Sequence, residues 1–332
     1  MPVNPTFLMY LYMKPFTIPI TLTNSQSSAT PAPFQQLINI DPSTIGSSYF
    51  SSDLGNIRFY ADSAFTQPLY AWVESGNSNT STSTNIWVNL PNGIPANSSI
   101  TIYMKLLSVG TEYDGVYMGE APQLSPTYGQ YDNGAKVFNN YWNFAGTSLP
   151  SGWSLYTGTG SGGSITVNNG ITLNSPGLSV NNGQGPFLNS TTTMSAPSAI
   201  DGLVLANTYA EIQFGVINGY GFAIGDFNIN GQPPNQYGIG TTNSNGSIAG
   251  WVATGGSETA GTPYVLSGYY TSSSVLFSNY QSVLTASISP TTQNLEIGGF
   301  STQAATSFIQ WLRTRAYPPN GVMPSVSIGS FA

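Results

Sequence analysis

The sequence predicts an all-β protein made of two β-sandwich domains in tandem, with a strand-forming N-terminal extension. Short runs of β-branched and aromatic residues alternate with turn residues along the whole chain, which holds 37 glycines and 23 prolines in 332 residues. Such short runs between turn residues are typical of sandwiches and barrels. The strongest helical signal is a short one that follows Asp41-Pro42-Ser43. The length suits two domains, since a domain usually has roughly 100–200 residues.

Residues 1–15 are an N-terminal extension that precedes the first predicted domain. Between Pro5 and Pro15 it holds seven consecutive apolar residues, namely Phe7, Leu8, Met9, Tyr10, Leu11, Tyr12 and Met13. The run is far shorter than the ~20 residues of a membrane-spanning helix, and no basic region precedes it as in a signal peptide. Side chains that are apolar on both faces predict a strand buried on both sides. We expect this assembly strand to add to a sheet edge of a neighbouring copy; pairing within its own chain is the alternative.

Residues 16–107 predict the smaller, immunoglobulin- or jelly-roll-like sandwich. In its first strand Phe16, Ile18, Ile20 and Leu22 lie on one face. Pro19 predicts that this strand is an edge strand or carries a bulge, because proline cannot donate to the ladder. Further strands are expected at 37–40, 57–60, 69–73, 86–90 and 100–106. Six or seven short strands in about 90 residues match the size of a sandwich domain.

Residues 108–137 interrupt this rhythm with glycines and prolines, and we interpret them as the linker between the domains. Four acids lie here in a chain that has few elsewhere: Glu112, Asp114, Glu120 and Asp132. A cation site is one interpretation of this concentration. We favour the other, a solvated linker that keeps the two sandwiches from collapsing together.

Residues 138–332 predict the larger sandwich. Its candidate strands are 165–167, 171–173, 202–206, 210–216, 221–224, 250–253, 283–288, 295–299 and 308–315. Asn-Gly pairs at 169–170, 230–231 and 245–246 predict hairpin turns. Arg313 and Arg315 lie two apart on the last of these strands and therefore on one face. We expect them to form ion pairs with acids on the adjoining strand.

Two stretches resemble known families. Residues 16–107, with FTIPITLTN, IRFYADSAFTQPLYAWVE, IWVNLP and ITIYM, resemble the DUF2341-type β-sandwich, a domain of unknown function found in cell-surface proteins of archaea and some bacteria. Residues 138–332, with VFNNYWNFAGTSLPSGW, ITVNNGITL and FIQWLRTRAYPPNGVMPSVSIG, resemble the concanavalin A-like lectin/glucanase domains that often follow it. The resemblance implies the tandem seen in archaeal cell-surface proteins, and it carries no catalytic residues over to this chain.

The composition argues against an enzyme. The chain has no histidine and no cysteine, and only six basic and 13 acidic residues. Histidine is the usual acid–base group near neutral pH, and histidine and cysteine are the softer metal ligands. We therefore predict no catalytic, cofactor-binding or metal site. The net charge of −7 and the scattered basic residues also argue against a nucleic-acid partner.

Glycoside hydrolysis is the enzymatic alternative that the second resemblance raises. Glucanases of that class carry alternating acids, Glu-x-Asp-x-Glu, on one strand, and the nearest match here is EIQFG at 211–215. Inverting and retaining mechanisms both need two carboxyls at defined separations, and this strand supplies Glu211 alone. Four acids elsewhere could converge with it, namely Asp201, Asp226, Glu258 and Glu296, but no pattern in the sequence indicates that they do.

Two groups of loop residues are candidate ligand contacts. Residues 226–231 (DFNING) match the opening of a calcium loop, but Tyr237 stands where the loop needs its twelfth-position acid, so a strand ending in an Asn-Gly turn is the better interpretation. Tyr264, Tyr269 and Tyr270 lie among serine, glycine and threonine and are candidate glycan contacts. Ordinary cross-strand packing is the alternative for these rings.

The remaining surface signals indicate a protein outside the cell. Hydroxyl and amide side chains take the place of charge, and no stretch is long enough to cross a membrane. Four N-x-[ST] sequons, at Asn79, Asn97, Asn189 and Asn245, are candidate sites of glycosylation. Because few carboxyls are present, we expect acid to change the stability little.

Together these observations predict a secreted or cell-surface structural protein that assembles with copies of itself. A head-to-tail contact through the N-terminal strand does not close on itself and so builds an extracellular filament. A carbohydrate-binding, lectin-like adhesion module is the alternative, and a glycoside hydrolase is the third and weakest hypothesis.

Overall fold

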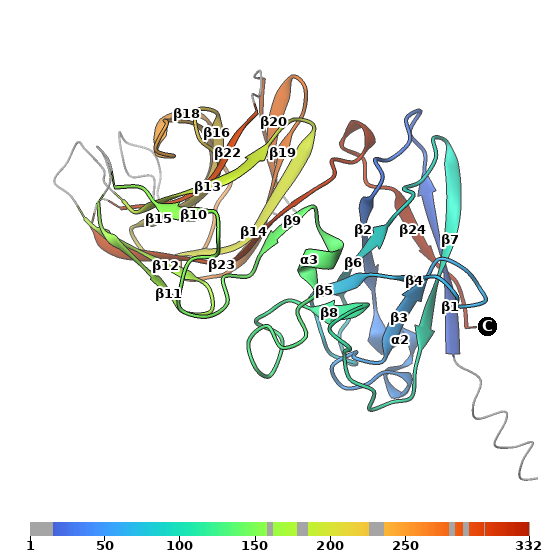
Figure 1. Ribbon diagram of the computed structural model, residues 1–332. Helices are drawn as coiled ribbons and strands as arrows, with labels where there is room; N and C mark the ends of the chain where they lie inside the picture. Colours follow the sequence, from blue (N-terminus) through green and yellow to red (C-terminus); the bar gives the residue numbers. More distant parts are fainter. Residues whose placement is uncertain are drawn as a thin grey trace, which may run out of the picture. The chain divides into compact units, whose positions relative to one another are not determined.

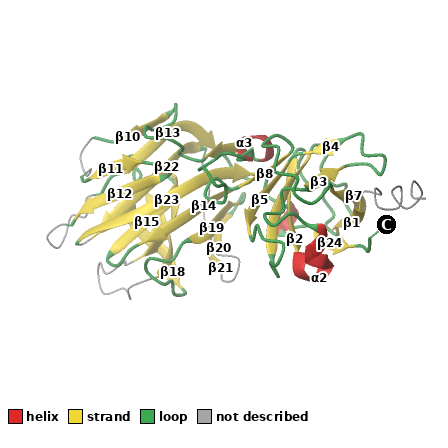
Figure 2. Cartoon of the chain, turned by 90° about the horizontal axis from the view of Figure 1, so that it is seen from below, coloured by secondary structure: helices red, strands yellow, loops and turns green. Residues whose placement is uncertain are grey.

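The computed structural model describes residues 16–157, 162–177, 185–225, 236–278, 283–287, 292–301 and 303–331 (Figure 1). Almost all regular structure in these ranges is strand, with two short α-helices (Figure 2), which confirms the predicted all-β class. The assembly strand at 7–13 and the calcium-loop candidate at 226–231 lie outside the described residues. The chain divides into two compact units. Unit 1 ends at Phe138 and resumes at Pro318, and unit 2 is Asn139–Tyr317.

Unit 1 contains a five-stranded sheet, in the order β24-β1-β7-β3-β4, and a four-stranded sheet, in the order β2-β6-β5-β8. All strand pairs are antiparallel except β5 with β8. The strands are β1 (Phe16–Asn24), β2 (Phe34–Ile40), β3 (Ile57–Tyr60), β4 (Pro68–Leu69), β5 (Ala71–Ser75), β6 (Thr84–Leu90), β7 (Ser98–Leu106), β8 (Met118–Glu120) and β24 (Ser325–Ile328). The helical elements are α2 (Pro42–Gly46), α3 (Gly134–Val137) and the 3-10 turns η1 (Ser47–Tyr49) and η2 (Pro319–Gly321).

Local sequence explains the first elements of unit 1. Ile18, Ile20 and Leu22 of β1 are buried, as the alternation predicts. The predicted short helix is α2, and Asp41 caps it: its Oδ1 accepts a hydrogen bond from the Thr44 N–H at 2.9 Å. A capping aspartate satisfies one of the backbone donors that the first turn leaves without a partner.

The course of the chain through unit 1 differs from the prediction in three ways. Residues 108–137 are not a separate linker, because β8 pairs with β5 and α3 contacts both β5 and β6. The last residues of the chain return to unit 1, where β24 pairs with β1 in the register Ile20↔Ile328. For that reason β1 lies between β7 and β24 and is not an edge strand, although it contains Pro19. The two units are therefore nested along the chain rather than in simple tandem.

Unit 2 is a sandwich of a seven-stranded and an eight-stranded sheet. The first has the order β10-β13-β22-β15-β16-β17-β18, and the second β11-β12-β23-β14-β19-β20-β21 with β9 paired to β23. The strands are β9 (Asn140–Trp142), β10 (Trp153–Leu155), β11 (Ser164–Val167), β12 (Ile171–Pro176), β13 (Phe187–Met194), β14 (Ser198–Ala206), β15 (Ala210–Val216), β16 (Tyr220–Gly225), β17 (Gln236–Thr242), β18 (Ile248–Gly255), β19 (Tyr264–Tyr270), β20 (Ser274–Ser278), β21 (Val283–Ser287), β22 (Gln293–Ser301) and β23 (Ala304–Arg315).

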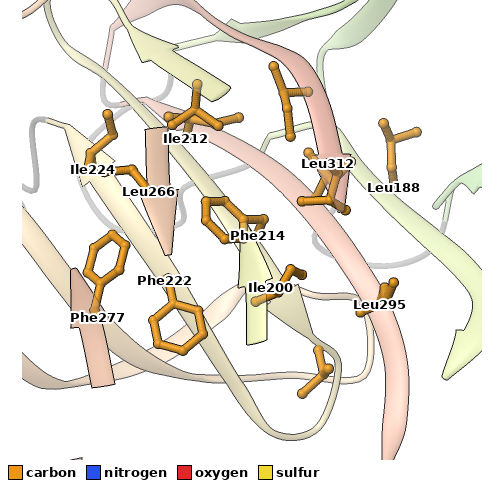
Figure 3. Close-up of a cluster of buried hydrophobic side chains, with 14 of the residues drawn as sticks. Leu188, Ile200, Ile212, Phe214, Phe222, Ile224, Leu266, Phe277, Leu295 and Leu312 are labelled. Atoms are coloured by element: carbon orange, nitrogen blue, oxygen red, sulfur yellow. The ribbon is translucent and has the colours of Figure 1, made fainter. Parts of the chain in front are cut away.

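The core of unit 2 lies between its two sheets. Ile212 and Phe214 of the seven-stranded sheet pack with residues such as Ile200 and Leu266 of the eight-stranded sheet (Figure 3). The alternate residues of each strand therefore point to the opposite face. Two predicted Asn-Gly turns are confirmed: residues 168–170 join β11 to β12, and residues 243–247 join β17 to β18. The third, at 230–231, lies outside the described residues.

The return of the chain to unit 1 leads to a prediction about its stability. Deleting residues 322–332 removes β24 and with it the four residue pairs that β24 makes with β1. At roughly 1 kcal/mol for each ladder hydrogen bond, we expect unit 1 to lose about 2–4 kcal/mol. Amide exchange at 20–23 of β1 should accelerate, and exchange in β15 of unit 2 should not. A chain that ends after Gly329 retains β24 and is the control; unchanged protection of β1 in the longer deletion would contradict the prediction.

Candidate functional site

A polar cluster lies on the face of the seven-stranded sheet that points away from the core. Glu211 and Gln213 belong to β15, where they alternate with the core residues Ile212 and Phe214. Glu296 belongs to β22, opposite Gly215 in the pairing of the two strands. Residues opposite each other share a face, so β22 brings Glu296 to the same side as Gln213, 83 positions earlier in the chain.

Hydrogen bonds within the chain fill this cluster. The Gln213 side-chain amide donates to both carboxyl oxygens of Glu296, each at 3.1 Å, and to the carbonyl oxygen of Gly246. Gly246 belongs to the turn between β17 and β18, so this turn folds over the two side chains. A Cβ at position 246 would lie 3.1 Å from a Glu296 carboxyl oxygen, and the φ of +98° there also favours glycine.

The environment keeps both glutamates neutral. Burial raises the pKa of Glu211 from 4.5 to about 8. Burial also raises the pKa of Glu296 to about 8; the hydrogen bond from Gln213 opposes this shift, and the nearby Glu211 charge adds to it. The common cause is that an ionised carboxyl is poorly solvated away from water. At pH 7 the cluster therefore holds two carboxylic acids rather than two carboxylates.

This geometry does not suit glycoside hydrolysis. The two acids of a glycosidase flank a bound sugar and so must reach it. Glu211 is 2% exposed and Glu296 is 0% exposed. Between them stands Gln213, an amide that can neither donate a proton as an acid nor act as a carboxylate nucleophile. The cluster is best explained as a buried hydrogen-bonded network.

A second buried cluster confirms the expectation for Arg313 and Arg315. Both lie on β23, and Asp201 of the neighbouring β14 stands opposite Arg313. The Nε atoms of both arginines lie 2.8 Å from Asp201 Oδ2, and all three side chains are almost fully buried. Burial would raise the pKa of Asp201, but the two guanidinium groups outweigh it and hold the pKa at about 2. One buried carboxylate thus contacts two buried guanidinium groups inside unit 2.

The four acids of 108–137 make separate contacts, and no three of these described residues come together as metal ligands. Asp114 forms an ion pair with Arg58 at 2.9 Å, and Asp132 accepts a hydrogen bond from the Trp72 indole N–H at 2.9 Å. Glu120 is buried, which raises its pKa, and Glu112 accepts a hydrogen bond from the Tyr131 hydroxyl. The solvated-linker interpretation is therefore wrong for the region as a whole, because these acids hold loops of unit 1 in place.

The three candidate glycan-binding tyrosines do not form a common surface. They belong to β19, where alternation places Tyr269 on the face opposite to Tyr264 and Tyr270. Tyr270 is 2% exposed, and its hydroxyl donates to the Tyr220 carbonyl, so its ring belongs to the core. The Tyr269 hydroxyl accepts a hydrogen bond from Arg315 at 3.1 Å. Tyr264 is half-buried, and its hydroxyl accepts one from the Thr259 N–H. The alternative, structural packing, explains all three better.

The four sequons differ in how far a glycan could reach them. A glycan can be attached only to an accessible asparagine side chain. Asn97, in the turn before β7, is exposed and is the most accessible of the four. Asn79 is half-buried, and its amide donates to the Ser47 carbonyl. Asn189 is also half-buried, and its amide faces the carbonyl oxygens of Leu188 and Asn245. Asn245 is buried, and its side-chain oxygen accepts hydrogen bonds from the Ser247 N–H and hydroxyl. Glycosylation thus stays a prediction, and Asn97 is the sequon whose exposure suits it best.

Two general properties hold for the part of the chain that the structure describes. No three acids there come together in a way that could hold a metal ion. None of the described helices has the length and apolar character needed to span a membrane.

Solved glucanases are among the structures that resemble part of the chain. A β-1,3-glucanase from Mycobacterium marinum has a TM-score of 0.40 at 10% identity, covering 53% of this chain and 98% of that one. The β-glucanase of Bacillus licheniformis has a TM-score of 0.39 at 13% identity, covering 53% of this chain and 97% of that one. Similarity at this level says nothing about activity, so the predicted concanavalin A-like resemblance of 138–332 stays a prediction.

Sequence relatives give a closer comparison. The chain is 35% identical over 334 aligned positions to "Uncharacterized protein 562" of Sulfolobus islandicus rod-shaped virus 1. The alignment covers 92% of this chain, and the chain spans 58% of the length of that relative. Residues 53–115 match the family described as "Domain of unknown function (DUF2341)". The match confirms, for that part of unit 1, the DUF2341-type resemblance that the sequence motifs predict.

Proposed function

We propose that this protein is a non-catalytic structural protein outside the cell, in which the apolar strand of one copy adds to a sheet of another and builds a filament. The observation that carries the proposal concerns β1, the strand that follows the apolar run. A chain that precedes a strand most simply turns back and pairs with it as a hairpin. On one side β1 pairs with β7, and on the other with β24 and the residues after it, so a hairpin with β1 would have to displace these C-terminal residues.

The occupation of β1 can be followed residue by residue. On one side β7 pairs with all nine of its residues, from Phe16↔Leu106 to Asn24↔Ser98. On the other side β24 pairs with residues 20–23. Beyond the end of β24, the Gly329 N–H donates to the Pro19 carbonyl at 2.8 Å, and the Phe331 ring lies 5.6 Å from that of Phe16. The C-terminal residues thus cover the edge where a hairpin would have to form.

The apolar run still has to leave water. Burying seven such side chains contributes on the order of 10–20 kcal/mol, against about 1–2 kcal/mol per residue for ordering the backbone. Strand addition to another copy satisfies the backbone as well as the side chains.

Removing the segment tests the proposal. Deleting residues 1–15 should leave both units folded and abolish assembly, as followed by light scattering and electron microscopy. In the full-length chain, Leu11→Lys should have the same effect, because a lysine cannot be buried between sheets without a partner. Val3→Lys adds the same charge outside the apolar run and is the control that should still assemble. Assembly of the truncated chain would show that this mechanism is wrong.

The absence of cysteine allows the acceptor edge to be mapped. Two of the longer edge strands of the described sheets are β18 and β2, with Val252 and Asn39 exposed on them. Copies carrying Leu11→Cys can be mixed with copies carrying Val252→Cys or Asn39→Cys and then oxidised. Strand addition should give disulfide-linked dimers with the acceptor edge only. A chain that carries Leu11→Cys together with the edge cysteine serves as the control. If only this chain forms a disulfide, and it does so within itself, pairing between copies is wrong.

A further inference from the structure

Three aromatic side chains of unit 1 form an exposed cluster, which we call the aromatic platform. It consists of Phe16 at the start of β1, Tyr49 in η1 and Phe331 close to the end of the chain. Between ring centres, Tyr49 lies 4.5 Å from Phe16 and 4.9 Å from Phe331, and Phe16 lies 5.6 Å from Phe331. Each ring thus contacts the other two, although the three residues are far apart in the sequence.

The aromatic platform is open to solvent. Phe16 is 42% exposed and Phe331 is 37% exposed, and Tyr49 is half-buried. The residues that precede two of the rings, Ser48 and Ser330, are polar and exposed. An exposed group of apolar side chains with a polar rim is a common mark of an interaction surface. Aromatic side chains also supply much of the binding energy at such surfaces.

Local structure holds the rings in place. Gly46 precedes η1 with a φ of +130°, and a Cβ there would lie 2.9 Å from two carbons of the Tyr49 ring, so glycine lets this ring pack back on the chain. At the other end of the chain, the Gly329 N–H donates to the Pro19 carbonyl at 2.8 Å, two residues before Phe331. Figure 1 accordingly shows the C-terminal end beside the start of β1. Rings that are already positioned lose little conformational entropy when a partner covers them.

The position of the aromatic platform relative to the assembly strand indicates the partner. The apolar run ends at Met13, and β1 begins at Phe16. The three residues of this step span at most about 11 Å, even when they are fully extended. A sheet edge that pairs with the whole assembly strand must therefore come this close to the platform. Where that edge belongs to another copy, the surface of that copy is brought against the three rings.

We propose that the aromatic platform is a second contact between copies in the filament, and that it packs on the neighbouring copy beside the edge that accepts the assembly strand. The inference rests on the proposed strand addition and names a further surface of the copy that donates the strand. The three rings carry no charge, and a second copy suits them because the chain has only six basic and 13 acidic residues in 332. Strand and platform together bind one neighbour, so the added contact needs no further segment to become ordered.

Replacing Phe331 tests the aromatic platform while the assembly strand is intact. Phe331→Ser should raise the critical concentration for filament formation by about tenfold or more, because truncating an aromatic hot spot costs at least that factor. Sedimentation and light scattering measure this concentration. The melting temperature of the unassembled chain should not change, because Phe331 lies beyond β24.

Two variants serve as controls for the loss of the ring. Phe331→Tyr retains an aromatic ring at this position and should assemble like the unmodified chain. Tyr117→Ser removes a different ring of unit 1, which is 38% exposed and stacks on Tyr70, and should also assemble normally. Equal losses from Phe331→Ser and Tyr117→Ser would overturn the proposal, because the platform would then have no specific role.

Thiol labelling tests the contact directly. The chain has no cysteine, so Ser330→Cys places a single reactive thiol beside the platform. This thiol should react quickly with a maleimide in unassembled chains and about tenfold or more slowly in filaments, where the contact must open first. In a chain that also carries Leu11→Lys, which should not assemble, the reaction should stay fast. Slow labelling before assembly would show that the chain's own N-terminal residues cover the platform, and it would overturn the proposal.

The outcomes distinguish this inference from the proposed function. Assembly of the chain that lacks residues 1–15 contradicts strand addition and, with it, the platform contact. If that deletion abolishes assembly but Phe331→Ser forms filaments at an unchanged concentration, the platform inference alone is wrong. The same holds if the Ser330→Cys thiol stays fully reactive in filaments.

Discussion

Replacing Asp201 by asparagine should destabilise unit 2 by about 3–5 kcal/mol, the usual cost of removing one partner from a buried ion pair. Asparagine has almost the same shape as aspartate, so the change removes charge and little else. Arg313 and Arg315, which both lie 2.8 Å from the Asp201 carboxyl, would then lose the buried carboxylate that they share. Denaturant unfolding followed by tryptophan fluorescence measures the loss.

A triple replacement distinguishes the effect of charge from that of packing. Changing Asp201 to leucine and both arginines to methionine removes all three charges while filling a similar volume. Replacing a whole buried ion pair by apolar residues is often neutral or stabilising, so the triple variant should be much more stable than Asp201→Asn. A triple variant as unstable as the single one would mean that packing, rather than the loss of the shared carboxylate charge, sets the cost.

The second large effect concerns pH. Glu211 and Glu296 have a pKa of about 8 in the folded chain and an ordinary value of 4.5 when unfolded. Between these values the folded chain retains protons that the unfolded chain releases, so stability falls as the pH rises. The stabilisation is fully present below pH 4.5 and is lost as the pH rises through 8. At 1.36 kcal/mol per pKa unit, the loss between pH 4.5 and 7 is on the order of 3 kcal/mol for each glutamate.

Asp201 determines how the stability of the folded chain changes at low pH. Its pKa of about 2 lies below the ordinary 3.8, so its contribution is present above pH 3.8 and is lost as the pH falls through 2. We therefore expect maximal stability near pH 4, in place of the nearly flat acid response that the composition predicts. Melting temperatures between pH 2 and 9 measure the profile.

Matched variants assign the slope to the two glutamates. Glu211→Gln and Glu296→Gln cannot ionise, so each should flatten part of the decline between pH 4.5 and 8. Asp62→Asn changes a carboxyl in an exposed loop of unit 1 and should leave that decline as it is. A decline that persists with both glutamates replaced would show that other groups cause it.

Local sequence was sufficient to predict the class of fold and many of its parts. Alternation and turn residues predicted β3 at 57–60 and β15 at 210–216 with the bounds that the structure has. The Asp41 cap and the Asn169-Gly170 turn were also predictable, because a cap and a tight turn depend on neighbouring residues only. The ion pairing of Arg313 and Arg315 needed one more step, the placement of both on one face of a strand.

The structure alone decided which strands pair across long separations. β24 has four residues, in which exposed serines alternate with the half-buried Val326 and Ile328, and so short a run does not indicate that it completes the sheet beside β1. The same holds for the contact of Gln213 with Glu296, whose strands are far apart in the sequence. Periodicity determines which face of a strand is buried, but the partner of that strand depends on how the whole chain packs, and local patterns do not encode it.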